Sequence, residues 1–316
     1  MHENYFVENL KHSTGMRVFF FAIIFLVCTL IGAAVTSIMA FGGDLMLKWA
    51  QGIGSLMMFV APPIIYYCLT RKEGPMKALG FRKIASPILF FVVISILLVF
   101  ISLPFTNLLT SWNEDMQLGG PLEILQTWMR TLEDSAAAIT ERMLNVNSTG
   151  GLLLNLMVIA LIPALGEELT FRGVVQQGMT HRLKNPHLAI ILSAAVFSFI
   201  HFQFFGFLPR MFLGILLGYM FYITDSLWTS ILMHFLNNGT AVVLYYLNNI
   251  GVAHIDVEHF GAMQDTWIVV LSGVLVAGFI LWAWHERKCK MLLVALCKCD
   301  GESCSCTWNK KRRFSL

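Results

Sequence analysis

Long apolar runs dominate this 316-residue chain. Hydrophobic residues make up 57% of it and charged residues only 13%, which is outside the usual balance of a soluble globular domain. A helix needs about 20 apolar residues to cross the hydrocarbon core of a bilayer. Eight runs approach this length, at residues 16–40, 50–70, 86–111, 151–180, 187–207, 209–224, 226–249 and 264–284. The sequence therefore predicts an all-α polytopic integral membrane protein with about eight transmembrane helices. The fourth run carries charged residues and the sixth is short.

Basic residues predict the orientation of these helices. If the connecting segments alternate sides, 18 of the 22 Lys and Arg residues fall on one side and four on the other. Lys and Arg collect in cytoplasmic segments, so both termini are expected in the cytoplasm, with the protein in the plasma (inner) membrane. We read the first run as a retained helix, because further spans follow it rather than a polar mature domain.

Four segments organise the chain. Residues 1–149 hold three transmembrane helices and an outer amphipathic segment, 150–250 form a catalytic core, 251–286 supply the last helix, and 287–316 form a basic cytoplasmic tail. In the outer segment, Pro121 is expected to open a surface helix that acts as a structural lid. The tail contains five cysteines, four of them in a C-x-C…C-x-C pattern, and we favour a disordered or surface-associated tail over a metal site there.

Charged residues inside the fourth apolar run point to a functional site. Glu167 and Glu168 are followed by Arg172, and ionisable groups inside a membrane are rare and usually functional. Glu168 and Arg172 are spaced i, i+4, so they share a helix face and can form an ion pair. Glu167 is rotated by about 100° from Glu168, which leaves its carboxylate available as a base.

Two histidine motifs follow in later helices. They are Phe-x-x-x-His at 197–201 and His-x-x-x-Asn at 234–238. Taken singly, each histidine is more often a hydrogen-bonded interior residue than a catalyst. If the fourth and fifth helices form a hairpin around residues 184–186, Glu167 and His201 lie at the same depth, roughly 25 Å of helical rise from the turn. His234 is expected to join them only if the turn at Asp225 and Ser226 is recessed.

This set of side chains suits hydrolysis of an amide bond within the membrane. A carboxylate facing a histidine can activate water as a general base or through a bound metal. A second histidine and an amide, at His234 and Asn238, suit stabilisation of an oxyanion.

The three motifs, in this order and helical context, resemble those of the CPBP intramembrane proteases, which include CAAX prenyl endopeptidases and bacteriocin-processing or immunity proteins. The resemblance covers about residues 150–250. It implies that Glu167 and His201 activate the attacking water, that His234 and Asn238 support the oxyanion, and that Glu168 and Arg172 organise the site. It leaves a metal open, with zinc held by Glu167, His201 and His234 as the candidate. The implied substrate is a membrane-anchored peptide, CAAX-like or bacteriocin-like.

Other classes fit the sequence less well. His-Glu-x-x-His and Gly-x-Gly-Asp do not occur, and no serine lies in a convincing nucleophile elbow. A proton-coupled transporter would more often show an inverted repeat, whereas polar groups here are concentrated in the second half of the chain. A non-catalytic membrane scaffold or immunity protein is the other alternative. We expect no nucleic-acid partner.

Overall fold

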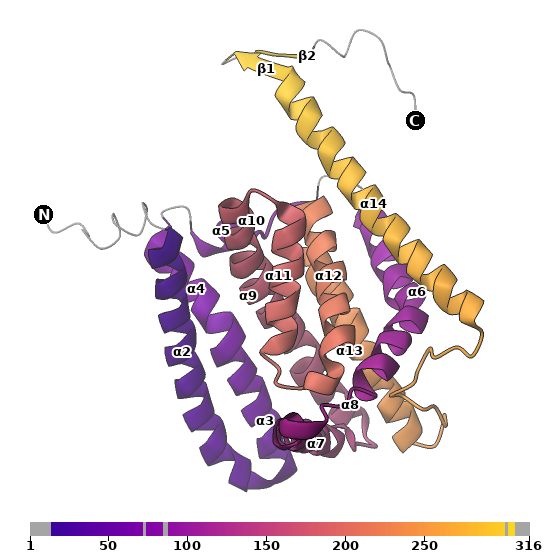
Figure 1. Ribbon diagram of the computed structural model, residues 1–316. Helices are drawn as coiled ribbons and strands as arrows, with labels where there is room; N and C mark the ends of the chain where they lie inside the picture. The colour runs from indigo at the N-terminus through magenta and orange to yellow at the C-terminus, as the bar shows by residue number, and fades with distance from the viewer. Residues whose placement is uncertain (1–13, 72–73, 85–87, 301–302, 307–316) are drawn as a thin grey trace, which may run out of the picture.

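The computed structural model describes residues 14–71, 74–84, 88–300 and 303–306. This part of the chain is a bundle of long helices, as predicted (Figure 1). The first half contains α2 (Thr14–Met39), η1 (Ala40–Gly42), α3 (Gly43–Ser55), η2 (Leu56–Val60), α4 (Ala61–Thr70), α5 (Pro75–Leu79), α6 (Ile88–Glu114), η3 (Gly120–Leu122) and α7 (Glu123–Leu144).

The second half continues with the helices that contain the polar motifs. They are α8 (Thr149–Asn155), η4 (Leu156–Leu161), α9 (Ile162–Thr170), η5 (Phe171–Gln176), α10 (Gln177–Leu183), α11 (Pro186–Phe199), η6 (Phe204–Gly206), α12 (Phe207–Thr224), α13 (Leu227–Asn249) and α14 (Thr266–Leu296). A short antiparallel pair, β1 (Cys297–Asp300) and β2 (Ser303–Cys306), follows α14.

Within the described residues, six helical segments are long and apolar enough to cross a membrane. They are Gly15–Met39, Gly43–Thr70, Ile88–Glu114, Thr149–Leu183, Phe204–Thr224 and Thr266–Lys288. The other two predicted runs are helical as well, as α11 and α13. The protein is therefore an all-α polytopic membrane protein, while a count of eight crossings and the cytoplasmic position of both termini remain predictions.

Two predicted boundaries were wrong. The fifth helix was expected to reach residue 207, but α11 ends at Phe199 and has only 14 residues. The amides of His201 and Phe202 bond to carbonyls three residues back, and Phe202 adopts a left-handed conformation with φ of 54°, so the chain turns away. The last helix was expected to end near residue 284 and instead continues to Leu296, after which a short strand pair follows. The basic residues at 310–313 lie outside the described residues.

The hairpin between the fourth and fifth helices forms at the predicted turn. Lys184 ends α10 in the left-handed conformation, and the Asn185 side chain accepts hydrogen bonds from the amides of His187 and Leu188 to cap α11. Pro186 occupies the first turn of α11, where its missing N–H costs nothing. The outer segment also forms a helix, α7. It lies across one end of the bundle, and α14 projects beyond the other end (Figure 1).

Three π-helical segments interrupt two of the long apolar segments, which we call rods. One of them, η2, lies in the rod Gly43–Thr70, and η4 and η5 lie in the rod Thr149–Leu183. A π segment shifts backbone bonding to i, i+5 and so leaves a carbonyl available to another partner. Side chains of neighbouring elements use these carbonyls. Thr170 Oγ1 donates to Phe59 O at 2.7 Å, and Ser193 Oγ donates to Phe171 O at 3.2 Å. The π segments therefore join the rods to each other through hydrogen bonds.

Candidate active site

Glu167 and Glu168 lie on α9, a short α-helical stretch between the π segments η4 and η5. Both residues are buried. Gly166, directly before them, lets α9 approach the η2 rod, because a Cβ there would lie 2.9 Å from the Cβ of Phe59. The sequence thus places the two carboxylates against a closely packed neighbour, inside an apolar bundle.

Glu168 and Arg172 form the predicted ion pair. Arg172 Nη1 donates to Glu168 Oε1 at 2.6 Å, and both side chains are fully buried. Arg172 Nη2 also donates to the carbonyl of Gly214 at 2.7 Å, which ties the pair to α12. On its other side, the guanidinium lies 5.1 Å from the centre of the Phe197 ring. The guanidinium of Arg172 therefore has three partners, although its buried Nε and the Oε2 of Glu168 have no hydrogen-bond partner among the described residues.

His234 joins the two glutamates. Its Nδ1 lies 3.0 Å from Glu168 Oε1, and its Nε2 lies 3.7 Å from Glu167 Oε2. His201 approaches the same oxygen, with its Nε2 3.9 Å from Glu167 Oε2. The structure thus brings the three predicted residues Glu167, His201 and His234 to one point, although they come from α9, the turn after α11, and α13.

Hydrogen bonding determines which nitrogen of each imidazole carries a proton. His201 Nδ1 lies 2.8 Å from the carbonyl oxygen of Phe197, which can only accept, so this nitrogen is protonated. The carboxylate of Glu168, paired with Arg172, likewise accepts from Nδ1 of His234. In their neutral forms both histidines therefore turn an unprotonated Nε2 toward Glu167. A water molecule between them can donate hydrogen bonds to two of these three acceptors.

The side chains differ in how far they reach the surface of the site. The exposed fraction is 24% for the His201 side chain and 10% for Glu167, but only 3% for His234. Access to the carboxylate is therefore expected from the side of His201.

Asn238 has contacts of a different kind. Its Nδ2 donates to the carbonyl of Ile159, in the π segment η4, at a long distance of 3.4 Å, and its Oδ1 accepts from Asn237 at 3.1 Å. None of its hydrogen bonds reaches Glu167, His201 or His234. The predicted oxyanion role of Asn238 stays a prediction, and this residue also links α13 to the rod that carries the glutamates.

The predicted zinc site at Glu167, His201 and His234 is not confirmed. Two imidazoles and a carboxylate are suitable zinc ligands. However, in the part of the chain that the structure describes, no group of three or more His, Cys, Asp or Glu side chains is arranged to hold a metal ion. No step below is assigned to a metal ion.

Sequence reasoning missed two contributors. The Phe197 ring contacts both imidazoles edge to face, with centroids 5.1 Å from His201 and 6.0 Å from His234. Its place in the Phe-x-x-x-His motif was the available signal. Arg210 interacts electrostatically with Glu167, although it lies outside the three sequence motifs.

Comparison with known proteins identifies this part of the chain. Residues 149–240 match the family model described as Type II CAAX prenyl endopeptidase Rce1-like. This segment belongs to the CPBP family. The match includes all the residues that meet at Glu167, and it confirms the resemblance seen in the three motifs. No curated protein and no solved structure matches the chain significantly.

Proposed function

We propose that the protein is an intramembrane endopeptidase that hydrolyses a peptide bond of a membrane-associated substrate, with Glu167 and His201 activating the attacking water. The observation that carries the proposal is the convergence of two imidazole Nε2 atoms, within 4 Å, on one carboxylate oxygen inside an apolar bundle. The CPBP match of residues 149–240 supports the same reaction class.

The chemistry begins with a water molecule that donates one hydrogen bond to Glu167 Oε2 and the other to His201 Nε2. Glu167 takes a proton while the water oxygen bonds to the carbonyl carbon of the substrate, and the carbonyl oxygen becomes an oxyanion. When the carbon–nitrogen bond breaks, the leaving nitrogen receives that proton. The products are a carboxylic acid and an amine.

The developing oxyanion needs positive charge or hydrogen-bond donors close by. His234 supplies them in its imidazolium form, because Glu168 accepts from Nδ1 and so supports the charge, while Nε2 faces the reaction centre. Asn238 is the predicted second donor, since its bond to the carbonyl of Ile159 is long and therefore weak. Arg172 holds Glu168 in place through the 2.6 Å ion pair.

The test is cleavage of membrane-anchored peptides by purified protein in liposomes, with a prenylated CAAX peptide as the first substrate. Wild-type protein is expected to cleave, and Glu167→Ala, His201→Ala and His234→Ala are each expected to lose at least about a thousandfold in kcat, because base and oxyanion support act as a unit. His181→Ala is the matched control, since His181 is exposed at the end of the same rod.

Melting temperatures of the purified variants separate loss of chemistry from loss of fold. Cleavage at the wild-type rate by all three folded variants would exclude the proposed mechanism. Wild-type protein that binds such peptides but cleaves none would instead favour the non-catalytic scaffold, and proton flux into the liposomes would favour the transporter.

A further inference from the structure

The turn after His201 contains a strained residue. Phe202 has a φ of 54°, in the left-handed region that a bulky side chain rarely adopts. Such a conformation persists only where the surroundings hold it. Because Phe202 is bonded directly to His201, whatever holds this turn also affects where the His201 imidazole lies relative to Glu167.

Side chains of helix α7, which lies outside the core, contact this turn. Glu133 Oε2 accepts a hydrogen bond from the backbone N–H of Phe205 at 2.8 Å. One turn earlier, the guanidinium of Arg130 stacks on the Phe205 ring, 3.5 Å from its centre. Trp128 contacts the neighbouring Phe204 ring with centroids 6.0 Å apart. Three side chains of α7 therefore meet the segment that begins three residues after His201.

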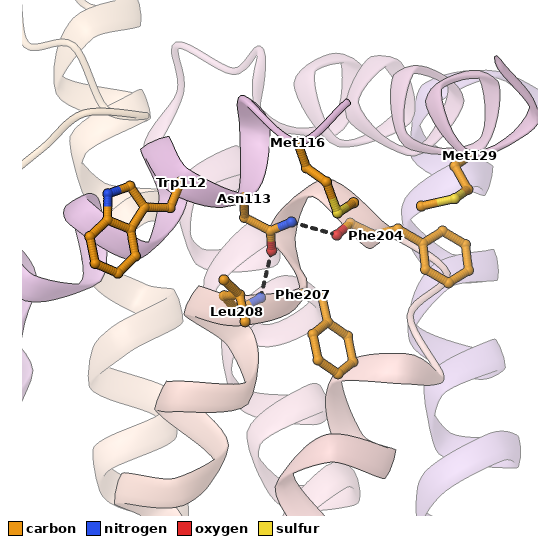
Figure 2. Close-up of a pocket in the computed structure, with 7 residues that line it drawn as sticks. All are labelled: Trp112, Asn113, Met116, Met129, Phe204, Phe207 and Leu208. Atoms are coloured by element: carbon orange, nitrogen blue, oxygen red, sulfur yellow. Dashed lines mark hydrogen bonds between the residues drawn. The ribbon is translucent and has the colours of Figure 1, made fainter. Parts of the chain in front are cut away.

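An open pocket lies beside the same segment. Its volume is about 280 Å³, it lies between α6, α7 and the start of α12, and Phe204 and Phe207 line it (Figure 2). Across it, the buried Asn113 donates to the carbonyl of Phe204 at 2.9 Å and accepts from the amide of Leu208 at 2.6 Å. Hydrogen bonds therefore tie this segment to α6 as well as to α7.

Arg210 lies beside both the turn at 202–206 and the reaction centre. Arg210, on the first turn of α12, donates to the carbonyl of Gln203 at 3.2 Å and to its side-chain oxygen at 2.7 Å. The Arg210 guanidinium interacts electrostatically with both Glu133 and Glu167. A Cβ on Gly206 would lie 3.0 Å from Arg210 Nη2 and 3.5 Å from Glu133 Oε1, so the two side chains converge beside Gly206.

We propose that Glu133 is a positioning residue: from α7, outside the residues that match the family model, it holds the turn at 202–206 and thereby fixes the His201 imidazole against Glu167. The catalytic consequence depends on the function proposed above, but the placement of His201 does not. Helix α7 then helps to position a residue of the site, in addition to the role of structural lid that the sequence predicted.

Three variants test this role. Glu133→Ala removes the acceptor of the Phe205 N–H, Glu133→Gln keeps an oxygen that can accept it, and Asp134→Asn changes the adjacent, exposed acid as a matched control. For each, kcat and KM for a membrane-anchored peptide are measured together with the rate at which diethyl pyrocarbonate modifies His201, read by mass spectrometry of the peptide that contains it. Melting temperatures show that the variants are folded.

Glu133→Ala is expected to lower kcat by about 10- to 100-fold with KM nearly unchanged, as expected for a displaced catalytic group. It is also expected to raise His201 modification several-fold, while Glu133→Gln and Asp134→Asn behave like wild type. Unchanged kcat and unchanged His201 modification in folded Glu133→Ala would overturn the proposal, as would equal effects in Glu133→Gln. If wild-type protein cleaves nothing, the modification rates alone decide the proposal, so its failure is distinct from failure of the proposed function.

Discussion

Helix α2 and the rod at Thr149–Leu183 are both apolar enough to span a membrane, but they use their polar side chains in opposite ways. In α2, the hydroxyls of Thr29 and Ser37 donate to carbonyls of their own helix, at Phe25 and Ala33. The polar groups of the rod bond to other helices: Thr170 to Phe59, Arg172 to Gly214, and Gln176 to Gly218 at 3.0 Å.

This contrast shows which contacts fix the helices relative to one another. Hydroxyl bonds within one helix add little to association between helices, whereas aromatic contacts join α2 to α4, such as that of the Phe21 ring on Tyr66 with centroids 5.4 Å apart. In the rod, polar bonds between helices fix the depth and rotation of α9 against η2 and α12. A catalytic carboxylate needs this kind of precise placement, and α2 carries none.

We expect the largest loss of stability from a substitution that breaks the ion pair in the rod Thr149–Leu183. Arg172→Met leaves the Glu168 carboxylate buried without its cation, which typically costs about 3–5 kcal/mol. We expect a loss of unfolding free energy of this size in mixed-micelle denaturation, with cleavage abolished. Arg182→Met, an exposed change near the end of the same rod, is the matched control. Equal stability of the two variants would remove the distinction between the rod and α2.

A smaller pair of substitutions compares the two regions directly. Thr170→Val and Thr29→Val remove the same hydroxyl, which bonds another helix in the first case and its own helix in the second. Interhelical hydrogen bonds in membranes average about 0.6 kcal/mol and reach about 1.7 kcal/mol. We expect a cost within this range for Thr170→Val and one below about 0.3 kcal/mol for Thr29→Val in the same denaturation assay. An equal cost at both positions would contradict the comparison.

Much of the fold could be predicted because apolar length and helical periodicity are local properties. The eight runs, the hairpin at Lys184 to Pro186, and the pairing of Glu168 with Arg172 all follow from spacing along one or two helices. The early end of α11 could not be predicted, since most residues just after Phe199 are apolar and the chain turns through a left-handed phenylalanine, Phe202.

The residues of the site could be predicted from the sequence better than the contacts between them. Equal depth in a hairpin predicted that His201 faces Glu167, and the structure places them 3.9 Å apart. The bond of His234 to Glu168 depends on how α13 packs against α9, which no spacing encodes. The same holds for Glu133, which is distant in sequence and reaches the site only through tertiary contacts.

The most direct test of the central claim, that Glu167 acts as the base for water, is turnover by metal-free protein. Wild type and Glu167→Gln are stripped with chelator, checked by elemental analysis and assayed on the same membrane-anchored peptide. We expect full activity for the metal-free wild type and a loss of at least about a thousandfold for Glu167→Gln. Loss of wild-type activity on stripping, restored by zinc, or near-normal turnover by Glu167→Gln would contradict it.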